Sequence, residues 1–388
     1  MSEPPTPDSP PLRPSMSHVV IAGGGVAALE TAAALHSVAA AEVQLTVIAP
    51  DREFVHRSLE PFLAFGIEVP PRLSLAMLVD RLGADLVSDR LAWVDRERRA
   101  VHCASGDTLA FDALVLALGA RVAPRFPHAM TLDDAAAGEL QRLVADIRAG
   151  EVTKVAFVAP ERMAWPLPLY EAALLTATVG AEQHRSLELT VVTAEAGPLQ
   201  AFGDTASEAM LALLDEHGVR VRAATRCRVP TGDCVALTGR DGRTRELMVD
   251  RVVALPELVG PHVRGVPSAS RGFMPIDRFC RVPGTSDIYA AGDGTDYPVK
   301  HGGIAAQQAG VVARSIAAAA GAQVTALPFH PTIHGLLLTG SEPRYLTARL
   351  TGGRAFGSRV STALGDRKSL SAKVAAPYLS DLLQQIAR

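Results

Sequence analysis

The stretch VVIAGGGVAALETAAAL, Val19–Leu35, decides the fold of this chain. A short β-branched run leads into three glycines and an alanine-rich helical segment, and a second β-branched run begins at Val43. Gly23-x-Gly25-x-x-Ala28 has the spacing of the dinucleotide fingerprint in its Ala-ended form. A tight turn without a ligand is the competing interpretation. The strand, helix and strand around the glycines favour a βαβ unit that binds a dinucleotide.

In such a unit an acidic residue commonly follows the second strand and binds the ribose hydroxyls. Here Ala49 stands at the end of that strand, so Asp51 is the nearest candidate and Glu53 is an alternative. A solvated loop acid explains either residue as well. Arg57, in the loop FVHRSLEPF that follows, is included among the predicted cofactor-binding residues.

The stretch VAFVAPERMAWPLPLYEAALL, Val155–Leu175, repeats the strand and the helix but not the glycines. Downstream, LELTVVTAE reproduces VQLTVIAPD, so that Leu189–Val191 corresponds to Leu45–Val47 and an internal duplication is indicated. The second joint reads Pro-Glu-Arg at 160–162. Proline removes an amide donor, and the glutamate adds negative charge beside any pyrophosphate. The joint therefore argues against ordinary NAD(P)H binding, although its arginine can offset that charge.

Composition limits the class of protein. The 388 residues carry a net charge of −3 and no run of Lys or Arg, which argues against nucleic acid as a partner. No apolar run is long enough to cross a bilayer. The cysteines form no C-x-x-C pair and no metal-like spacing with histidine, which indicates a reducing compartment, no metal and no dithiol chemistry. They are Cys103, Cys227, Cys234 and Cys280.

These patterns predict an α/β protein with two Rossmann-like domains and a small C-terminal region. Residues 1–17, rich in Pro and Ser, are expected to form a disordered leader. The first dinucleotide-binding domain is expected to comprise residues 18–125 and 262–325. The second, with the degenerate joint, is expected at 126–261, and residues 326–388 form the C-terminal interface region.

Three segments in order resemble the FAD oxidoreductases with two dinucleotide domains of the pyridine nucleotide–disulfide reductase superfamily. They are VVIAGGGVAALE, FDALVLALGA and DIYAAGDGTDYPVKHGGIAAQQA, within roughly residues 18–320. The resemblance implies FAD as cofactor, with Asp293 as an acceptor for a ribityl hydroxyl. It also implies that the helix beginning near residue 303 aims its amides at the flavin. By the resemblance the cofactor contacts include Gly119, Gly292, Asp293, Gly303, Ile304 and Ala305.

Within that superfamily, WPLPLYEAALL resembles the corresponding segment of sulfide:quinone oxidoreductases and flavocytochrome c sulfide dehydrogenases. In those families a redox-active cysteine sits at about the position of Trp165. Sulfur chemistry needs a thiolate, so sulfide oxidation is disfavoured here. Trp165, Glu171, Lys300 and His301 are the predicted catalytic residues. Trp165 and Tyr170 as ordinary core aromatics are the competing interpretation.

The segment AAQQAG, with Gln307 and Gln308, resembles the helix start of type II NADH dehydrogenases and favours a quinone or similar acceptor. Two polar residues on an ordinary helix are the alternative. The tail SLSAKVAAPYLSDLLQQIAR predicts a helix interrupted by Pro377. Packing on the protein body or on a second subunit is favoured for its apolar face, and membrane contact is the alternative. That face comprises Leu370, Val374, Tyr378, Leu382 and Ile386.

The leading hypothesis is an FAD-dependent oxidoreductase that passes electrons from an unidentified small donor through flavin to a quinone or another small acceptor. One alternative is an NAD(P)H dehydrogenase, type II-like, with an atypical nicotinamide site. The other is a non-catalytic flavoprotein that senses redox state. A cytoplasmic protein is expected, with peripheral contact at the inner face of a membrane and a homodimer left open.

Overall fold

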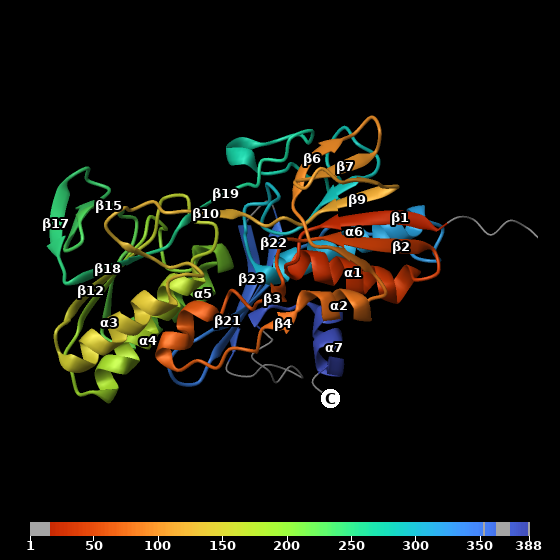
Figure 1. Cartoon of the computed structure of the whole chain (residues 1–388). Helices are drawn as coiled ribbons and strands as arrows, with labels where there is room; N and C mark the ends of the chain where they lie inside the picture. Colours follow the sequence, from red (N-terminus) through yellow and green to blue (C-terminus); the bar gives the residue numbers. More distant parts are fainter. Residues whose placement is uncertain (1–15, 352–353, 362–372, 387–388) are drawn as a thin grey trace, which may run out of the picture.

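The computed structural model describes residues 16–351, 354–361 and 373–386. Two α/β units lie side by side, the first coloured red to orange and cyan, the second yellow to green (Figure 1). Each unit is built on a five-stranded parallel sheet. The prediction of an α/β protein with two Rossmann-like sheets is confirmed. The predicted leader lies almost wholly outside the described residues.

The first sheet has the strand order β20-β9-β1-β2-β5. Val20, in the middle of β1, pairs with Thr46 on one side and Leu114 on the other. Side chains of β1 alternate between two cores: Val19 and Ile21 pack under the helices, and Val20 packs on the opposite face. Strands buried on both faces are typical of parallel sheets. The strands are β1 (Ser17–Ala22), β2 (Val43–Ile48), β5 (Asp85–Val87), β9 (Ala113–Leu116) and β20 (Ile288–Ala290).

The second sheet repeats this plan in the order β11-β18-β12-β13-β14. β12 takes the place of β1, and β13 takes the place of β2. Thr190 pairs with Ala156 in the register in which Thr46 pairs with Val20. The equivalence predicted from the repeated sequence therefore holds strand for strand. The strands are β11 (Met130–Thr131), β12 (Lys154–Val158), β13 (Glu188–Val192), β14 (Val219–Arg222) and β18 (Arg251–Ala254).

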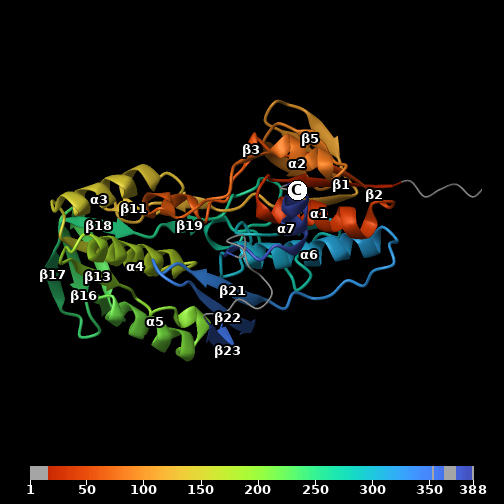
Figure 2. The same cartoon turned by 90° about the horizontal axis from the view of Figure 1, so that it is seen from below.

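Helices cover one face of each sheet, and a three-stranded antiparallel sheet covers the other. In the first unit α1 packs along α6 and against α7. Figure 2 shows α7 against α1, seen from below. The helices are α1 (Val26–Ala39), α2 (Leu75–Arg81), α3 (Ala137–Ala149), α4 (Leu167–Glu182), α5 (Asp204–Glu216), α6 (Gly302–Ala319) and α7 (Pro377–Ile386), with 3-10 turns η1 (Glu60–Phe65), η2 (Gln200–Phe202) and η3 (Ser270–Gly272).

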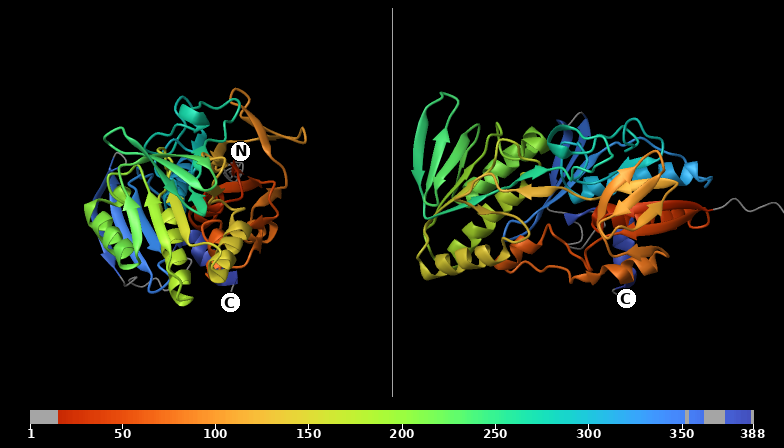
Figure 3. Two further views of the ribbon diagram at one scale, coloured as in Figure 1. Left: turned by 90° about the vertical axis from the view of Figure 1, so that its left-hand side faces the viewer. Right: turned by 45° about the horizontal axis from the view of Figure 1, so that its top comes forward.

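Two antiparallel sheets complete the units. One lies on the first unit and the other forms the outer end of the second (Figure 3). The first contains β6 (Leu91–Asp95), β7 (Ala100–Cys103) and β8 (Thr108–Ala110). The second contains β15 (Arg226–Thr231), β16 (Cys234–Thr238) and β17 (Thr244–Met248). Because both units carry a three-stranded antiparallel sheet, the internal repeat extends beyond the βαβ core.

Smaller sheets join the units. The chain leaves the first unit along β10 and returns along β19, and these strands pair with each other. A third sheet, β21-β22-β23, packs against α5 of the second unit and α6 of the first. The predicted domain limits remain a prediction. The strands of all the smaller sheets are β3 (Glu53–Phe54), β4 (Leu73–Ser74), β10 (Arg121–Ala123), β19 (Glu257–Val259), β21 (Thr332–Leu337), β22 (Arg344–Thr351) and β23 (Arg354–Ser361).

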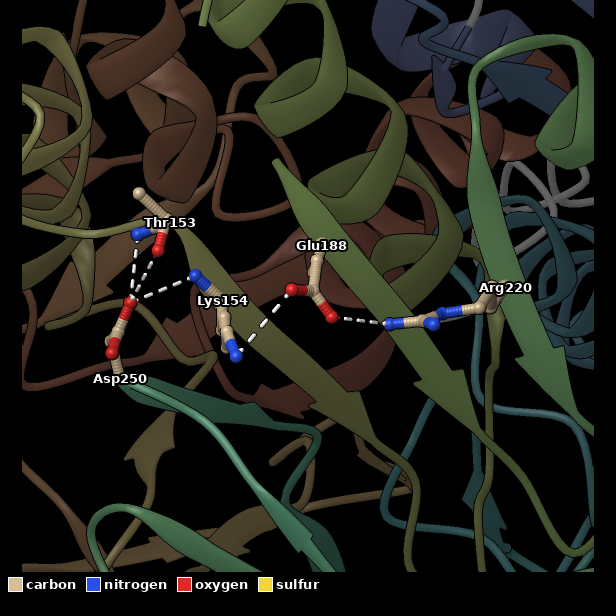
Figure 4. A network of polar contacts seen from close by, with 5 residues as sticks. All are labelled: Thr153, Lys154, Glu188, Arg220 and Asp250. Atoms are coloured by element: carbon tan, nitrogen blue, oxygen red, sulfur yellow. Dashed lines mark hydrogen bonds and ion pairs between the residues drawn. The ribbon is translucent and has the colours of Figure 1, made fainter. Parts of the chain in front are cut away.

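Polar side chains tie together the strand starts of the second sheet (Figure 4). Asp250 accepts hydrogen bonds from the backbone N–H groups of Thr153 and Lys154 at 2.7 and 2.8 Å. Glu188 lies 3.4 Å from Lys154 Nζ and 3.0 Å from Arg220 Nη2. These ion pairs are exposed, so solvent screens them and each contributes little to stability. They lie at the edge opposite the joint of residues 159–164.

The tail differs from its predicted form. The helix α7 begins at Pro377 instead of being interrupted there, because proline lacks the N–H that a first helical position leaves unbonded. Val374 lies outside this helix, and Leu370 lies outside the described residues. Leu379 and Leu382 are buried against the first unit, so α7 packs on the protein's own body. Among the described helices, none combines the length and apolar character needed to span a membrane.

Candidate functional site

The three glycine turns of the first unit meet at the carboxyl edge of its sheet. Gly23 has φ +130°, and a Cβ at this position would lie 2.1 Å from the carbonyl oxygen of Ala117. A Cβ on Gly294 would lie 2.8 Å from the carbonyl oxygen of Gly119. The turns after β1, β9 and β20 therefore touch one another. In open α/β sheets this edge, at the point where strand order reverses, is where ligands bind.

The start of α1 is open. Gly25 is its N-cap, and a Cβ built there would have no described atom within 4 Å. The first hydrogen bond within the helix is from Leu29 N to Gly25 O, so the preceding amides of the first turn are left for another partner. Ala28 is fully buried, as the close helix–strand contact requires. This geometry suits the negative charge of a pyrophosphate.

The turn after β20 carries an acid without a hydrogen-bond partner. Gly292 has φ +84°, and its N–H donates to Gln308 Oε1 at 2.7 Å. The next residue, Asp293, makes no hydrogen bond within the residues that the structure describes. Burial raises the pKa of its carboxyl, and the nearby charge of Lys300 opposes that rise. A ligand hydroxyl would supply the hydrogen bond that this carboxylate lacks.

Asp51 and Arg57 lie on the exposed loop after β2. Arg57 pairs with Asp134, which follows β11 of the second unit. The pair bridges the two units at the surface. The structure does not bring Asp51 or Arg57 into contact with the glycine turns through any recorded hydrogen bond, so their predicted cofactor role remains a prediction.

Three of the four predicted catalytic residues come together beside the start of α6. The ring centroids of Trp165 and His301 lie 4.4 Å apart, and Trp165 also packs 5.3 Å from Phe202. The backbone N–H of Lys300 donates to the carbonyl of Ala164 at 3.3 Å. The glycine-free joint of the second unit is thus hydrogen-bonded to the segment that leads into α6.

His301 caps α6. Its Nδ1 accepts a hydrogen bond from Gly303 N at 3.2 Å, so the ring proton sits on Nε2, and that nitrogen donates to the carbonyl of Lys373. Burial lowers the pKa of His301 to about 4, and the charge of Lys373 lowers it further. The side chain is therefore a neutral imidazole at physiological pH, with both nitrogens occupied.

Lys300 is also buried, with 7% of its surface exposed. Its Nζ donates to the carbonyl of Thr295 and lies 4.1 Å from the ring centroid of Phe273. Burial lowers the pKa of Lys300 to about 8, against the opposing charges of Asp293 and Asp296. The residue therefore carries positive charge at pH 7 and can give up a proton slightly above it.

Glu171, the fourth predicted catalytic residue, is fully buried in α4. It accepts hydrogen bonds from Lys373 Nζ at 2.7 and 2.9 Å and from Leu338 N at 3.0 Å. Burial raises the pKa of Glu171, and Lys373 opposes this. Its oxygens are satisfied inside the protein, so it supports the site through Lys373. Sequence reasoning missed Lys373, because its partner lies 202 residues away.

The start of α4 differs from the start of α1. Pro166 is its N-cap and Pro168 is the second helical residue, so the first turn offers fewer free amides. Glu195 corresponds to Asp51 of the first unit, yet it turns inward and accepts a hydrogen bond from Tyr170 Oη at 2.8 Å. Burial raises the pKa of Glu195, and the hydrogen bond from Tyr170 opposes this. The acid at the nucleotide edge of the second unit is thus hydrogen-bonded inside the protein.

The glutamines of α6 serve the fold. Gln308 is fully buried and braces the Gly292 turn. Gln307 donates to the carbonyls of Gly303 and Thr332 and accepts from Thr332 N, which ties α6 to β21. The hypothesis that these side chains line an acceptor site is therefore not supported by their hydrogen bonds. Cys280 is also fully buried, and burial raises its pKa.

Comparison with known proteins agrees with this geometry. Residues 170–324 match the family model described as pyridine nucleotide-disulphide oxidoreductase. The fold resembles the sulfide:quinone oxidoreductase of the hyperthermophilic bacterium Aquifex aeolicus, with 19% identity, a TM-score of 0.75, and coverage of 89% of this chain and 87% of that one. A search of curated proteins found no match.

Two further solved structures share the fold. The ferredoxin reductase for the CYP199A2 system of Rhodopseudomonas palustris is 21% identical, with a TM-score of 0.63 over 87% of this chain and 83% of that one. NDH2 of Plasmodium falciparum, solved with NADH, is 16% identical, with a TM-score of 0.58 over 72% of this chain and 64% of that one. The chain is thus similar to pyridine nucleotide-disulphide oxidoreductases in the matched residues and in its fold. The family match and the fold support an FAD-dependent oxidoreductase.

The residues of this oxidoreductase fit FAD. The open start of α1 suits the pyrophosphate, and the unbonded carboxylate of Asp293 suits a ribityl hydroxyl. Gly119 has φ +68° and open space beside it, which leaves room between the turns. The start of α6 is less open than these turns. Gly303, Ile304 and Ala305 are buried, and residues 374–375 lie against Gly302 and Gly303.

Proposed function

We propose that this oxidoreductase takes electrons from a small donor other than NAD(P)H and passes them through FAD to a quinone or another small acceptor. The observation that carries the proposal is the hydrogen bond between Tyr170 and Glu195, which engages the acid at the nucleotide edge of the second unit. The two prolines at the start of α4 support it. Directly after the joint, Trp165 packs against His301 of the first unit.

FAD supplies the electron chemistry when bound, since it takes up and gives back a pair of electrons. The residues of the chain set its surroundings. Gly23, Gly25 and Asp293 would hold the cofactor. Lys300, protonated at pH 7, places a positive charge beside Asp293 and can exchange a proton because its pKa is near 8. Trp165 excludes water from the space beside His301.

The acceptor is proposed by analogy. The Aquifex aeolicus structure is named a sulfide:quinone oxidoreductase. By the resemblance of the segment WPLPLYEAALL, that class of enzyme has a redox-active cysteine at about the position of Trp165. A donor that needs a thiolate is therefore not proposed. A peripheral membrane location would follow if the acceptor is a membrane quinone.

An anaerobic titration of the flavoprotein tests the proposal. NADH and NADPH are expected to leave the visible flavin absorbance unchanged, whereas dithionite bleaches it and a soluble quinone analogue restores it. Rapid stoichiometric bleaching by either nicotinamide would overturn the exclusion of NAD(P)H. Failure of all quinones and small acceptors to reoxidise the reduced protein would overturn the acceptor side and favour a redox-sensing flavoprotein.

A second candidate is a type II-like NAD(P)H dehydrogenase. One observation favours it: Arg162 is exposed in the joint, where it can pair with a phosphate. Replacing Arg162 with alanine separates the candidates, because only a nicotinamide-dependent enzyme would lose NADH affinity. The NDH2 structure solved with NADH shows that this fold can hold the nucleotide in a relative.

A further inference from the structure

Two buried carboxylates anchor the segment Lys373–Leu379, called here the C-terminal strap. At its start, Lys373 Nζ bonds Glu171 of α4 at 2.7 and 2.9 Å. At its end, the backbone N–H groups of Tyr378 and Leu379 donate to Glu30 of α1 at 3.3 and 2.7 Å. One anchor belongs to the helix after the glycine-free joint and the other to the helix after the glycine turn. The strap therefore connects equivalent helices of the two units.

Between its anchors the strap covers the start of α6. A Cβ on Gly302 would lie 2.8 Å from the side chain of Val374, and a Cβ on Gly303 would lie 3.7 Å from Ala375 N. Lys373 is 4% exposed, and its carbonyl receives the hydrogen bond of the His301 ring. The strap thus forms part of the surroundings of His301.

We propose that the Glu171–Lys373 ion pair is a positioning element of this oxidoreductase. The pair locks the strap over the start of α6, so that the strap forms one wall of the substrate site and fixes the His301 ring against Trp165. This inference rests on the proposed function, which places the substrate beside Trp165 and His301. Lys373 is a positioning residue, because it acts through His301.

The contacts explain why both charges are needed. A lysine buried without its carboxylate, or the carboxylate without its lysine, leaves an uncompensated charge in the interior. Loss of either partner alone is therefore expected to loosen the strap. Among the residues that the structure describes, His334 of β21 is a further titratable group that lowers the pKa of His301. Lys373 thus docks the strap and, after burial, also lowers the pKa of His301.

Hydrogen exchange on the full-length, FAD-loaded protein tests the lock. The variant Lys373→Met is expected to exchange at least tenfold faster than wild type in peptides spanning residues 374–386. The matched control is Lys154→Met, which breaks the exposed Lys154–Glu188 pair of Figure 4 and is expected to leave those peptides within twofold. Exchange in Lys373→Met within twofold of wild type would overturn the proposal.

A second variant keeps the test decisive if Lys373→Met does not fold. The double variant Glu171→Met with Lys373→Met removes both charges together and leaves none unpaired. Its His301 pKa, followed by NMR of histidine-labelled protein, is expected to rise above the wild-type value of about 4, because a strap without its ion pair buries the ring less and the charge of Lys373 is gone. An unchanged value would overturn the positioning role.

These measurements need no turnover. Faster exchange together with an inactive wild-type enzyme would overturn the proposed function and leave the lock intact. Quinone reduction by wild type together with unchanged exchange in Lys373→Met would support the proposed function and overturn the lock.

Discussion

Tyr170 Oη donates a 2.8 Å hydrogen bond to Glu195 across the gap between the first turn of α4 and the loop after β13. Glu195 also accepts from Gln200 N at 3.0 Å. In a dinucleotide-binding unit an acid near the end of this strand commonly faces the ribose hydroxyls. Here the second unit keeps the strands of a nucleotide fold while its acid is used inside the protein.

The variant Tyr170→Phe removes the donor and leaves a buried carboxylate oxygen without one of its partners. We expect a loss of about 1–3 kcal/mol in the free energy of unfolding, measured with urea at pH 8. Tyr345→Phe is the control, because its hydroxyl makes no hydrogen bond in the described part of the chain. Equal free energies of unfolding for Tyr170→Phe and wild type would show that this hydrogen bond does not stabilise the protein.

Asp293→Asn tests the predicted cofactor carboxylate. A hydrogen bond to a charged group contributes about 1.5–3 kcal/mol, so the variant is expected to bind FAD roughly 10- to 100-fold more weakly. Fluorescence titration of the apoprotein with FAD measures this. Asp296→Asn, three residues away and exposed, serves as control. If both variants bind FAD as wild type does, Asp293 does not contact the cofactor.

Trp165→Ala tests the substrate wall. Trp165 packs on both His301 and Phe202, so its removal opens the space beside the imidazole to water. We expect turnover to fall at least tenfold with FAD content unchanged. Trp165→Phe, which keeps an aromatic ring, should retain most of the activity. Normal turnover in the alanine variant would make Trp165 a core aromatic.

Local patterns were enough to predict much of the fold. The β-branched runs of β1, β2, β12 and β13 are buried strands, and the glycines at 23 and 25 form the turn that their spacing predicts. Alternation and glycine positions act over a few residues, so they can be read along the sequence. The repeated run LTV also placed β13 correctly, because a shared register follows from a shared sequence.

The site could be predicted only in part. Trp165, Lys300 and His301 were expected near the flavin, and the structure brings these three together. Glu171 and Gln308 have other partners because tertiary contacts decide how a buried polar group is satisfied. Glu171 pairs with Lys373 across 202 residues, and no local pattern marks such a pair. The prediction of a helix interrupted by Pro377 is wrong, because proline also fits the first position of a helix.

Glu30 carries a prediction about pH. This residue of α1 is 1% exposed and accepts the first-turn amides of α7, while burial raises its pKa from 4.5 to about 7. Between these values the native state holds a proton that the unfolded chain has lost. The free energy of unfolding therefore falls as pH rises from 4.5 to 7, by about 3 kcal/mol at 1.36 kcal/mol per pKa unit.

Glu30→Gln should abolish this component, because a carboxamide does not titrate. The stability difference between wild type and Glu30→Gln is therefore expected to shift against wild type by about 3 kcal/mol between pH 4.5 and 7, and to stay constant above pH 8. Urea unfolding at pH 5, 6, 7 and 8 measures it, with the exposed Glu97→Gln as control. A shift of opposite sign would mean that the two helix amides outweigh burial and hold Glu30 ionised. Parallel pH curves would mean that burial and the amides cancel.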